Sequence, residues 1–324
     1  MNVPIRWGIL SAGRIADRFT TDLRKVPDTE IMAVAARSLQ RATKFAAKHH
    51  IPHAYGSYAE LATDPNIDVI YVATTHNLHK EHTLLCLENG KHVLCEKPFA
   101  LNAAEASQMI ACAHQKKLFL MEGMWSRFNP AYQRAMYWIK NGMIGEVRML
   151  KADFGFRALW DPEHRILNQI LGGGSILDVG IYPIALASQL LGSQPTDIQA
   201  LACLGITEVD EQAGIVLKYP HGQLALLSSA VRTRTLHNAF IFGTEGIVWI
   251  PLFWRARLSL LWRAKKLPRI TWNQAGYHFE AAEVNRCIRE NKLESTTVSL
   301  ADTLARMEIL DQIRAKVGLK YPGE

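Results

Sequence analysis

Apolar residues follow two different spacings over the first third of the chain. Between short apolar runs, residues such as Ile15, Phe19 and Leu23 recur at the spacing of one face of a helix. Strands separated by such helices pair in parallel through right-handed crossovers. The pattern predicts a doubly wound parallel α/β sheet, with strands at residues 5–10, 31–36, 69–73, 92–95 and 118–121.

The pattern changes after about residue 124. Residues 175–191 and 300–317 keep the helical spacing, but the other apolar runs follow one another with turn signals between them. Strands without intervening helices pair mostly antiparallel. Residues 124–324 are therefore predicted to form an α+β domain, separate from the first domain at residues 1–123. Its expected strands lie at residues 149–154, 198–204, 213–219, 224–230, 239–242 and 247–250.

The composition fits two folded domains. Of 324 residues, 48% are hydrophobic and 21% are charged, which are ordinary values for a globular protein. The net charge of +7 comes almost entirely from one segment between Pro251 and Gln274 that has no acidic residue. Because the basic residues form no recognition motif, we expect no nucleic-acid partner. The basic residues of this segment are Arg255, Arg257, Arg263, Lys265, Lys266 and Arg269.

This basic segment, residues 252–272, has two interpretations. We favour an edge strand with its loop, in which arginine and lysine side chains prevent edge-to-edge aggregation. Contact with an anionic membrane surface or an acidic partner is the alternative.

Cysteine usage and hydropathy indicate a cytoplasmic protein. The five cysteines include no C-x-x-C pair, so neither a disulfide framework nor a structural zinc site is indicated. Charged residues interrupt the longest apolar stretches before they reach the ~20 residues that span a bilayer. We therefore expect no membrane span and reduced thiols.

A glycine-containing turn follows the first predicted strand. Residues 8–16 read Gly-Ile-Leu-Ser-Ala-Gly-Arg-Ile-Ala and open a helix, which is the context in which such a motif binds a dinucleotide. Free amides at the helix start would hold the phosphates. A purely structural turn of the same composition is the alternative. The residues expected to bind the cofactor here are Ser11, at the first glycine position of the motif, with Gly13, Arg14 and Ile15.

The residues after the second strand favour NADP(H) over NAD. An NAD enzyme would place an acidic residue here for the ribose hydroxyls, but the chain reads Ala36-Arg37-Ser38. Arg37 can pair with a 2′-phosphate through two hydrogen bonds, and Ser38 can donate a further one. The alternative is a solvated arginine at a strand end.

Several longer segments then point to one family. The chain resembles the glucose-fructose oxidoreductase, inositol dehydrogenase and rhizopine-catabolism (Gfo/Idh/MocA) oxidoreductases, and within them the NADP-dependent dihydrodiol and D-xylose dehydrogenases. The resemblance implies a Rossmann domain, a second domain with an open-faced sheet, a nicotinamide cofactor and a diol or sugar substrate. It is carried by residues 7–9, 33–37, 54–58, 93–98, 119–122, 125–128 and 177–182.

The Glu96-Lys97-Pro98 segment matches the signature of that family. The resemblance implies that Lys97 lies beside the nicotinamide and the reacting hydroxyl, with Glu96 among the cofactor-binding residues. A lysine beyond the carboxyl end of a parallel strand lies where such sheets bind ligands, and a cation there lowers the pKa of a neighbouring proton carrier. A surface lysine in a tight turn is the alternative.

Asp178 and Tyr182 are four positions apart on a predicted helix, so their side chains share one face. The resemblance implies that Tyr182 is the general acid/base. A phenol with a pKa near ~10 needs a cation such as Lys97 close by to act as a base at neutral pH. Asp178 is either part of this catalytic set or the carboxylate of a capping box with Ser175.

Two further groups complete the predicted site. The resemblance implies that Thr75, His76, Asn77 and His79 lie near the nicotinamide ribose. His82 shares this region, but the histidine spacing suits no metal site and hydride transfer needs none. Aromatic side chains are expected to form an apolar wall for the substrate, and an arginine to orient its hydroxyls. The alternatives are core packing for each aromatic residue and a structural ion pair for the arginine. The substrate residues are Trp125, Arg127 and Phe154, together with Asp178 and Tyr182.

These residues together predict an NADP-dependent oxidoreductase that moves a hydride between the nicotinamide and a carbinol carbon of a trans-dihydrodiol or a sugar such as D-xylose. Another sugar, inositol or anhydrosugar enzyme of the family, or a non-catalytic NADP-binding regulator, is the alternative. An open sheet leaves an apolar face that must be covered, so a homodimer through the C-terminal sheet is expected.

Overall fold

The computed structural model describes residues 3–264 and 266–324, so Lys265 of the basic segment lies outside the described residues. The chain forms two compact units. The first contains the chain up to Ala100, Ala104–Trp125 and Gly276–Thr303. The second contains Leu101–Ala103, Ser126–Ala275 and Leu304–Glu324.

The predicted boundary at residue 123/124 therefore needs one correction, because Gly276–Thr303 belongs to the first unit. Helix α8 (His278–Arg289) packs against α1 (Arg14–Leu23) and buries Ala281 and Val284. The indole Nε1 of Trp7 donates to Asn285 Oδ1 at 3.0 Å. The sequence could not predict that the chain comes back to the first unit here, because the apolar face of α8 does not indicate which surface it covers.

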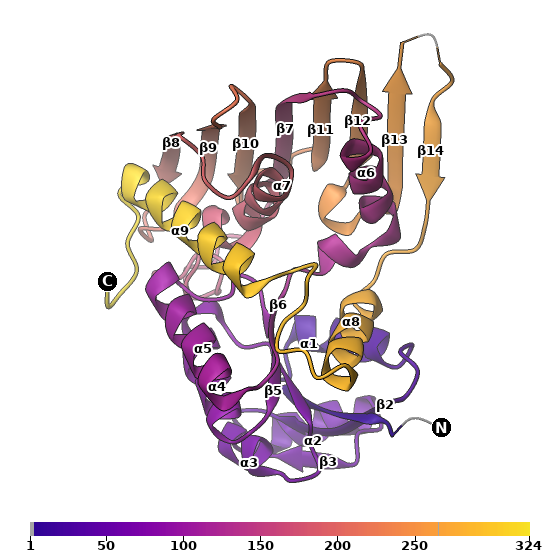
Figure 1. The fold of residues 1–324 in the computed structure, drawn as a ribbon. Coiled ribbons are helices and arrows are strands. Elements are labelled where there is room, and N and C mark those ends of the chain that lie inside the picture. Colours follow the sequence, from indigo (N-terminus) through magenta and orange to yellow (C-terminus); the bar gives the residue numbers. More distant parts are fainter. Residues whose placement is uncertain (1–2, 265) are drawn as a thin grey trace. The chain divides into compact units, whose positions relative to one another are not determined.

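The first unit is built on a six-stranded parallel sheet, which confirms the doubly wound prediction (Figure 1). The strand order is β3-β2-β1-β4-β5-β6, so the order reverses beside β1. Ligands bind to such sheets at the carboxyl ends of the strands near this reversal. The strands are β1 (Ile5–Leu10), β2 (Thr29–Ala35), β3 (His53–Tyr55), β4 (Val69–Val72), β5 (His92–Glu96) and β6 (Leu120–Gly123).

The helices of this unit connect successive strands. Two short elements, β3 and α3 (Tyr58–Thr63), were not predicted, because elements of three and six residues are too short for a periodicity to emerge. A capping box between Ser57 and Glu60 starts α3. The other connecting helices are α1, α2 (Leu39–Lys48), α4 (His79–Glu88) and α5 (Ala103–Lys116).

The second unit is built on an eight-stranded sheet in the order β14-β13-β12-β11-β7-β10-β9-β8. All its neighbouring strands are antiparallel except β7 and β10, which confirms the mostly antiparallel prediction. The strands are β7 (Val147–Gly155), β8 (Asp197–Leu204), β9 (Asp210–Lys218), β10 (Leu224–Ala230), β11 (Asn238–Gly243), β12 (Gly246–Pro251), β13 (Leu258–Arg263) and β14 (Arg269–Trp272).

The basic segment forms the hairpin of β13 and β14, and β14 is an edge of the sheet. This placement agrees with the edge-strand interpretation. Lys266 and Arg269 are exposed there. Their charges make the edge a poor template for a further strand.

Helices cover one face of this sheet. Helix α6 (Pro130–Lys140) packs on β12 and β13, and α7 (Ile181–Leu191) packs on β7 and β10. The predicted single helix at residues 175–191 is divided, because a π-helical turn, Ile176–Gly180, precedes α7. The last helix is α9 (Leu300–Val317).

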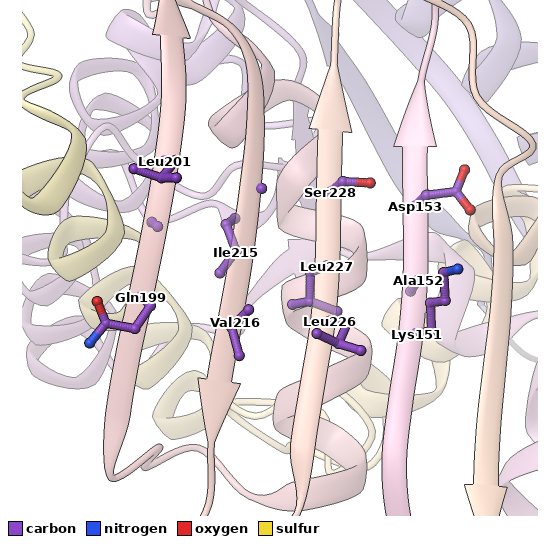
Figure 2. Close-up of a pocket in the computed structure, with 12 residues that line it drawn as sticks. Lys151, Ala152, Asp153, Gln199, Leu201, Ile215, Val216, Leu226, Leu227 and Ser228 are labelled. Atoms are coloured by element: carbon purple, nitrogen blue, oxygen red, sulfur yellow. The ribbon is translucent and has the colours of Figure 1, made fainter.

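The opposite face of the sheet is open, and its side chains are largely apolar. Figure 2 shows Leu201, Val216 and Leu226 on neighbouring strands, where they line a shallow hollow with Lys151 and Asp153. Leu201 is 84% exposed. On the other half of the face, aromatic rings form a stacked row with centroids 5.8 to 6.1 Å apart, made of Phe242, Phe240, Trp249 and Trp262.

One helical stretch, Gln169–Leu191, is long and apolar enough to cross a membrane by composition alone. However, 89% of its apolar window is buried inside the protein. We found no other such stretch among the described residues. Burial of this kind is typical of a core helix.

Candidate functional site

The turn after β1 has the form that a dinucleotide pyrophosphate requires. Gly13 is the N-cap of α1, and because it has no side chain it cannot bond the first amides of the helix. A Cβ on Gly13 would meet only the Ser11 hydroxyl, at an ordinary distance of 3.6 Å, so the space in front of the helix start is open. Ser11 has φ of +100°, the region that favours glycine, which explains why a glycine is usual at this position. Arg14 and Ile15 follow in the first turn, whose amides suit a phosphate group.

The residues expected to select NADP(H) lie where β2 meets α2. Arg37 is exposed, and Ser38 caps α2 by accepting a hydrogen bond from the Arg41 amide at 3.4 Å. Burial raises the pKa of Tyr58, while the charges of Arg37 and Arg41 oppose the shift. The charges of both arginines therefore act on the Tyr58 hydroxyl, and sequence reasoning had not singled out Arg41.

The turn after β4 is held by internal hydrogen bonds. The Thr75 hydroxyl donates to Asn77 Oδ1 at 2.7 Å. His79 is fully buried, with Nδ1 2.7 Å from the Pro98 carbonyl oxygen, and His76 is also buried. Burial lowers the pKa of His79 to about 4, although its hydrogen bonds to backbone carbonyls oppose the shift. A neutral His79 therefore links this turn to the Glu96-Lys97-Pro98 segment.

Glu96 anchors the segment that carries Lys97. It is buried and accepts a short hydrogen bond from the Tyr71 hydroxyl and another from the Lys97 amide at 3.2 Å. Burial raises the pKa of Glu96, and its bond from Tyr71 and the charge of Lys97 oppose the shift. Lys97 is half-buried at the end of β5, which pairs with β4. The first unit thus brings the expected cofactor residues to one edge of its sheet.

Asp178 lies in the π-helical turn of the second unit and is buried. Arg165 Nη1 donates to Asp178 Oδ1 at 3.0 Å. The predicted capping box between Ser175 and Asp178 is wrong, because the Ser175 side chain makes no cap hydrogen bond to the backbone of the turn. The Ser175 hydroxyl instead donates to Asp210 at 2.6 Å.

Tyr182 lies in the first turn of α7 beside a cluster of aromatic rings. Its ring centroid is 5.5 Å from that of Phe154 and 6.3 Å from that of Trp254. Trp254 Nε1 donates to His237 Nδ1 at 3.2 Å, and His237 Nε2 donates to the Gly155 carbonyl at 2.6 Å. The imidazole thereby fixes the orientation of the indole. A buried phenol beside a pair of stacked apolar rings combines a group that can exchange a proton with a surface that suits a ring.

The other two expected substrate residues are buried. Trp125, in the first unit, stacks on Tyr277 with centroids 4.4 Å apart. Arg127, in the second unit, donates to the Ala185 carbonyl of α7 at 3.2 Å, so it supports the helix of Tyr182. Sequence reasoning missed Tyr277 because it lies far from Trp125 in the chain.

Sequence reasoning also missed His237 and Asp210. His237 follows no recognisable motif, although its φ of +58° marks an unusual turn. Asp210 gave no signal of its own. In the part of the chain that the structure describes, no group of three histidine, cysteine, aspartate or glutamate side chains is placed to hold a metal ion.

Comparisons with known proteins agree with this geometry. Residues 5–124 match the family model of oxidoreductases with an NAD-binding Rossmann fold, and residues 132–249 match the GFO/IDH/MocA C-terminal domain. The chain is 40% identical over 330 residues to the trans-1,2-dihydrobenzene-1,2-diol dehydrogenase of Mus musculus, and 37% identical over 330 residues to that of Homo sapiens. Each alignment covers 98% of both chains.

Solved structures share the whole fold. An aldose-aldose oxidoreductase from Caulobacter crescentus is 25% identical, with a TM-score of 0.89. The 3-ketoreductase KijD10 from Actinomadura kijaniata, crystallised with NADP and TDP-benzene, is 24% identical, with a TM-score of 0.86. Both matches cover 97% of this chain and 98% of the other. The chain therefore belongs to the Gfo/Idh/MocA family of oxidoreductases, has its nicotinamide dinucleotide-binding Rossmann fold and is a dehydrogenase of CH–OH groups.

Proposed function

We propose that this dehydrogenase uses NADP and acts on a trans-dihydrodiol or on a sugar such as D-xylose. The observation that carries the proposal is the position of Tyr182 beside Phe154 and Trp254, close in the chain to the buried carboxylate of Asp178. The aromatic rings suit the flat diene part of a dihydrodiol or the apolar face of a sugar. The full-length relatives named for dihydrobenzenediol support the first of these substrates.

The residues of each unit take separate tasks in this proposal. Tyr182 accepts the proton of the substrate hydroxyl as the carbon is oxidised, and Asp178, held by Arg165, orients the hydroxyl. From the family resemblance, we propose for Lys97 of the first unit the positive charge that favours the phenolate form of the general base. The cofactor-binding residues of the first unit would hold a nicotinamide dinucleotide, which would supply the hydride acceptor.

Arg37 is the residue that we propose for NADP preference. It is exposed at the end of β2, beside the Ser38 cap and near Arg41. Two guanidinium groups and a hydroxyl fit the charge of a 2′-phosphate. An acidic residue that would instead pair with ribose hydroxyls is missing from residues 36–38.

We further propose that two copies associate through the open face of the second sheet. The face carries the aromatic row of Phe240, Trp249 and Trp262 and the exposed Leu201 and Leu226. An apolar surface of this kind seldom stays in water. Self-association through one shared patch covers it on both copies.

The test is NADPH formation by the purified protein with trans-dihydrobenzenediol, D-xylose and D-glucose, run in parallel with NADP and NAD. We expect turnover with NADP, and a loss of roughly 10²- to 10⁴-fold in kcat for Tyr182→Phe, as for removal of a general base. Retained binding of NADP by the variant, measured by quenching of tryptophan fluorescence, would separate a catalytic defect from unfolding.

Two results would contradict the proposal. Turnover only with an inositol or an anhydrosugar would move the substrate to another branch of the family. An active Tyr182→Phe protein would remove the proton-transfer role from Tyr182.

A further inference from the structure

A buried carboxylate from the sheet holds the start of the segment that carries Asp178 and Tyr182. Asp210, the first residue of β9, is fully buried. Its Oδ2 accepts hydrogen bonds from the Ser175 hydroxyl at 2.6 Å and from the Ile176 amide at 2.7 Å. The Ser175 hydroxyl also lies 2.8 Å from Ser229 Oγ on β10. The start of the segment is therefore attached to two neighbouring strands.

The loop before this segment is shaped around the same carboxylate. Gly174 has φ of +110°, and a Cβ on it would collide with Asp210 Oδ1. Only glycine lets the backbone adopt this conformation so close to the carboxylate. The preceding carbonyl, of Gly173, accepts a hydrogen bond from the Tyr321 hydroxyl at 2.6 Å. Tyr321 thus holds the loop at Gly173, and Asp210 holds it at Ser175 and Ile176, on the other side of Gly174.

The turn that follows is irregular and needs external support. Ile176–Gly180 is a π-helical turn, and Ser175 gives it no side-chain cap. Such turns are rare and occur often at functional sites. A helix start is stabilised by an acceptor for its first amides and by negative charge. Asp210 supplies the acceptor to Ile176 from another element of the fold.

Stability alone is a poor explanation for this carboxyl group. Asp210 Oδ1 has no hydrogen-bond partner among the described residues. Burial raises the pKa of Asp210 to about 7, although the bonds from Ser175 and Ile176 oppose the shift. Burying an acid with one unsatisfied oxygen costs stability, so a gain in stability does not explain why an acid lies here.

We propose that Asp210 is a positioning residue, whose hydrogen bonds to Ser175 and Ile176 set where Asp178 and Tyr182 stand. It acts through the turn and does not itself touch the substrate. The catalytic part of this inference rests on the proposed function, in which Tyr182 exchanges the proton. The hydrogen bonds of Asp210 to the turn do not depend on the proposed function, and hydrogen exchange measures their effect directly.

The experiment compares Asp210→Ala with Asp210→Asn in the full-length protein saturated with NADP. Hydrogen exchange, read by mass spectrometry on peptides covering residues 172–182, reports the hold on the turn. For Asp210→Ala we expect faster exchange confined to this stretch, a kcat lower by roughly 10- to 100-fold and an unchanged Kd for NADP. Asp210→Asn keeps an oxygen acceptor for the Ile176 amide, so we expect it to recover most of the kcat.

A matched control comes from the same strand. Leu217 is fully buried on β9 but pairs with Ala225 and Ile198, away from the turn. Leu217→Ala should lower the melting temperature without faster exchange at residues 172–182 and without a selective loss of kcat. A structural role of Asp210 would make the two alanine variants behave alike.

The outcomes separate this inference from the proposed function. Normal exchange at residues 172–182 in Asp210→Ala, or an undiminished kcat in that variant, overturns the role of Asp210. If the wild type turns over no dihydrodiol or sugar, the proposed function fails, and the exchange measurement still decides whether Asp210 holds the turn.

Discussion

The indole ring of Trp254 stacks on the phenyl ring of Phe154, with centroids 4.8 Å apart and planes inclined by 16°. Both rings neighbour Tyr182. Because the flat diene part of a dihydrobenzenediol gains more from such a wall than a sugar does, Trp254→Leu should lower kcat/KM for trans-dihydrobenzenediol about tenfold, or about 1.4 kcal/mol. The loss for D-xylose should be smaller. Steady-state kinetics with both substrates gives the ratio.

The control for this change is Trp160→Leu. Trp160 is a half-exposed indole of the same unit that packs under Arg232, with 5.1 Å between the guanidinium carbon and the ring centroid. The ring neighbours of Phe154 among the described residues are Tyr182, His237 and Trp254, so loss of Trp160 should leave the substrate ratio unchanged. Equal losses for both substrates in Trp254→Leu would contradict a wall selective for the dihydrodiol ring.

Arg37 should decide between the two cofactors. Arg37→Gln removes a charge-assisted hydrogen-bond donor, which is worth about 1.5–3 kcal/mol, so Kd for NADP should rise roughly 10- to 100-fold. Binding of NAD should stay the same. Titration of tryptophan fluorescence with each cofactor measures both constants. Arg24→Gln, at the far end of α1, is the control, and a similar loss of NAD binding in Arg37→Gln would argue against 2′-phosphate recognition.

The features of the fold that depend on neighbouring residues could be predicted from the sequence. The strands from β1 to β12, except the short β3, were expected from their apolar spacing, whereas β13 and β14 were expected only as one edge strand with its loop. The residues of the dinucleotide turn follow from the strand and helix on either side of Gly13. Both types of evidence are contained in short stretches of chain. The same is true of the Glu96-Lys97-Pro98 segment, which ends a predicted strand.

Relationships between distant residues could not be predicted in this way. Ser175 and Asp178 have the spacing of a capping box, but Asp210, 35 residues from Ser175, takes the Ser175 hydroxyl instead. Gly276–Thr303 returns to the first unit because α8 covers α1. A sequence pattern shows that a side chain needs a partner without showing which one the fold provides.

Two copies of the protein should no longer associate through the open face of the second sheet when its aromatic row is interrupted. Trp249 lies between Phe240 and Trp262, so Trp249→Glu places a charge in the middle of the row. We expect the wild type to sediment as a dimer and this variant as a monomer, because burying an unpaired charge opposes association. Tyr137→Glu, an exposed position on α6 over the other face, should remain dimeric. A monomeric wild type in analytical ultracentrifugation would refute the proposed interface.

Glu280 should make the protein less stable as the pH rises. It is fully buried at the start of α8, and neither carboxyl oxygen has a hydrogen-bond partner among the described residues. Burial, followed by the charges of Glu96 and Asp22, raises its pKa well above the usual value. Its stabilising contribution is therefore complete below the unfolded pKa and is lost as the pH rises toward the folded pKa, at up to roughly 1.4 kcal/mol per pH unit.

Glu280→Gln removes this titration. The variant should melt at a higher temperature than the wild type at pH 8, and the difference should shrink toward pH 5. Differential scanning fluorimetry across this range provides the comparison, with Glu30→Gln as a control at an exposed position. Parallel curves for the wild type and Glu280→Gln would mean that Glu280 does not titrate in this range.

Glu324 should show the opposite dependence. Burial raises its pKa, but hydrogen bonds from Arg314, Asn102 and the Tyr321 amide outweigh this and lower the pKa to about 2. Its contribution is thus present above the unfolded pKa and is lost as the pH falls toward about 2. Allowing for solvent screening, Glu324→Gln should cost about 1 kcal/mol at pH 7, or ~2–4 °C in Tm. The difference from wild type should close as the pH falls below 4, and a deficit that stays constant down to pH 3 would mean that the carboxylate charge does not hold Arg314.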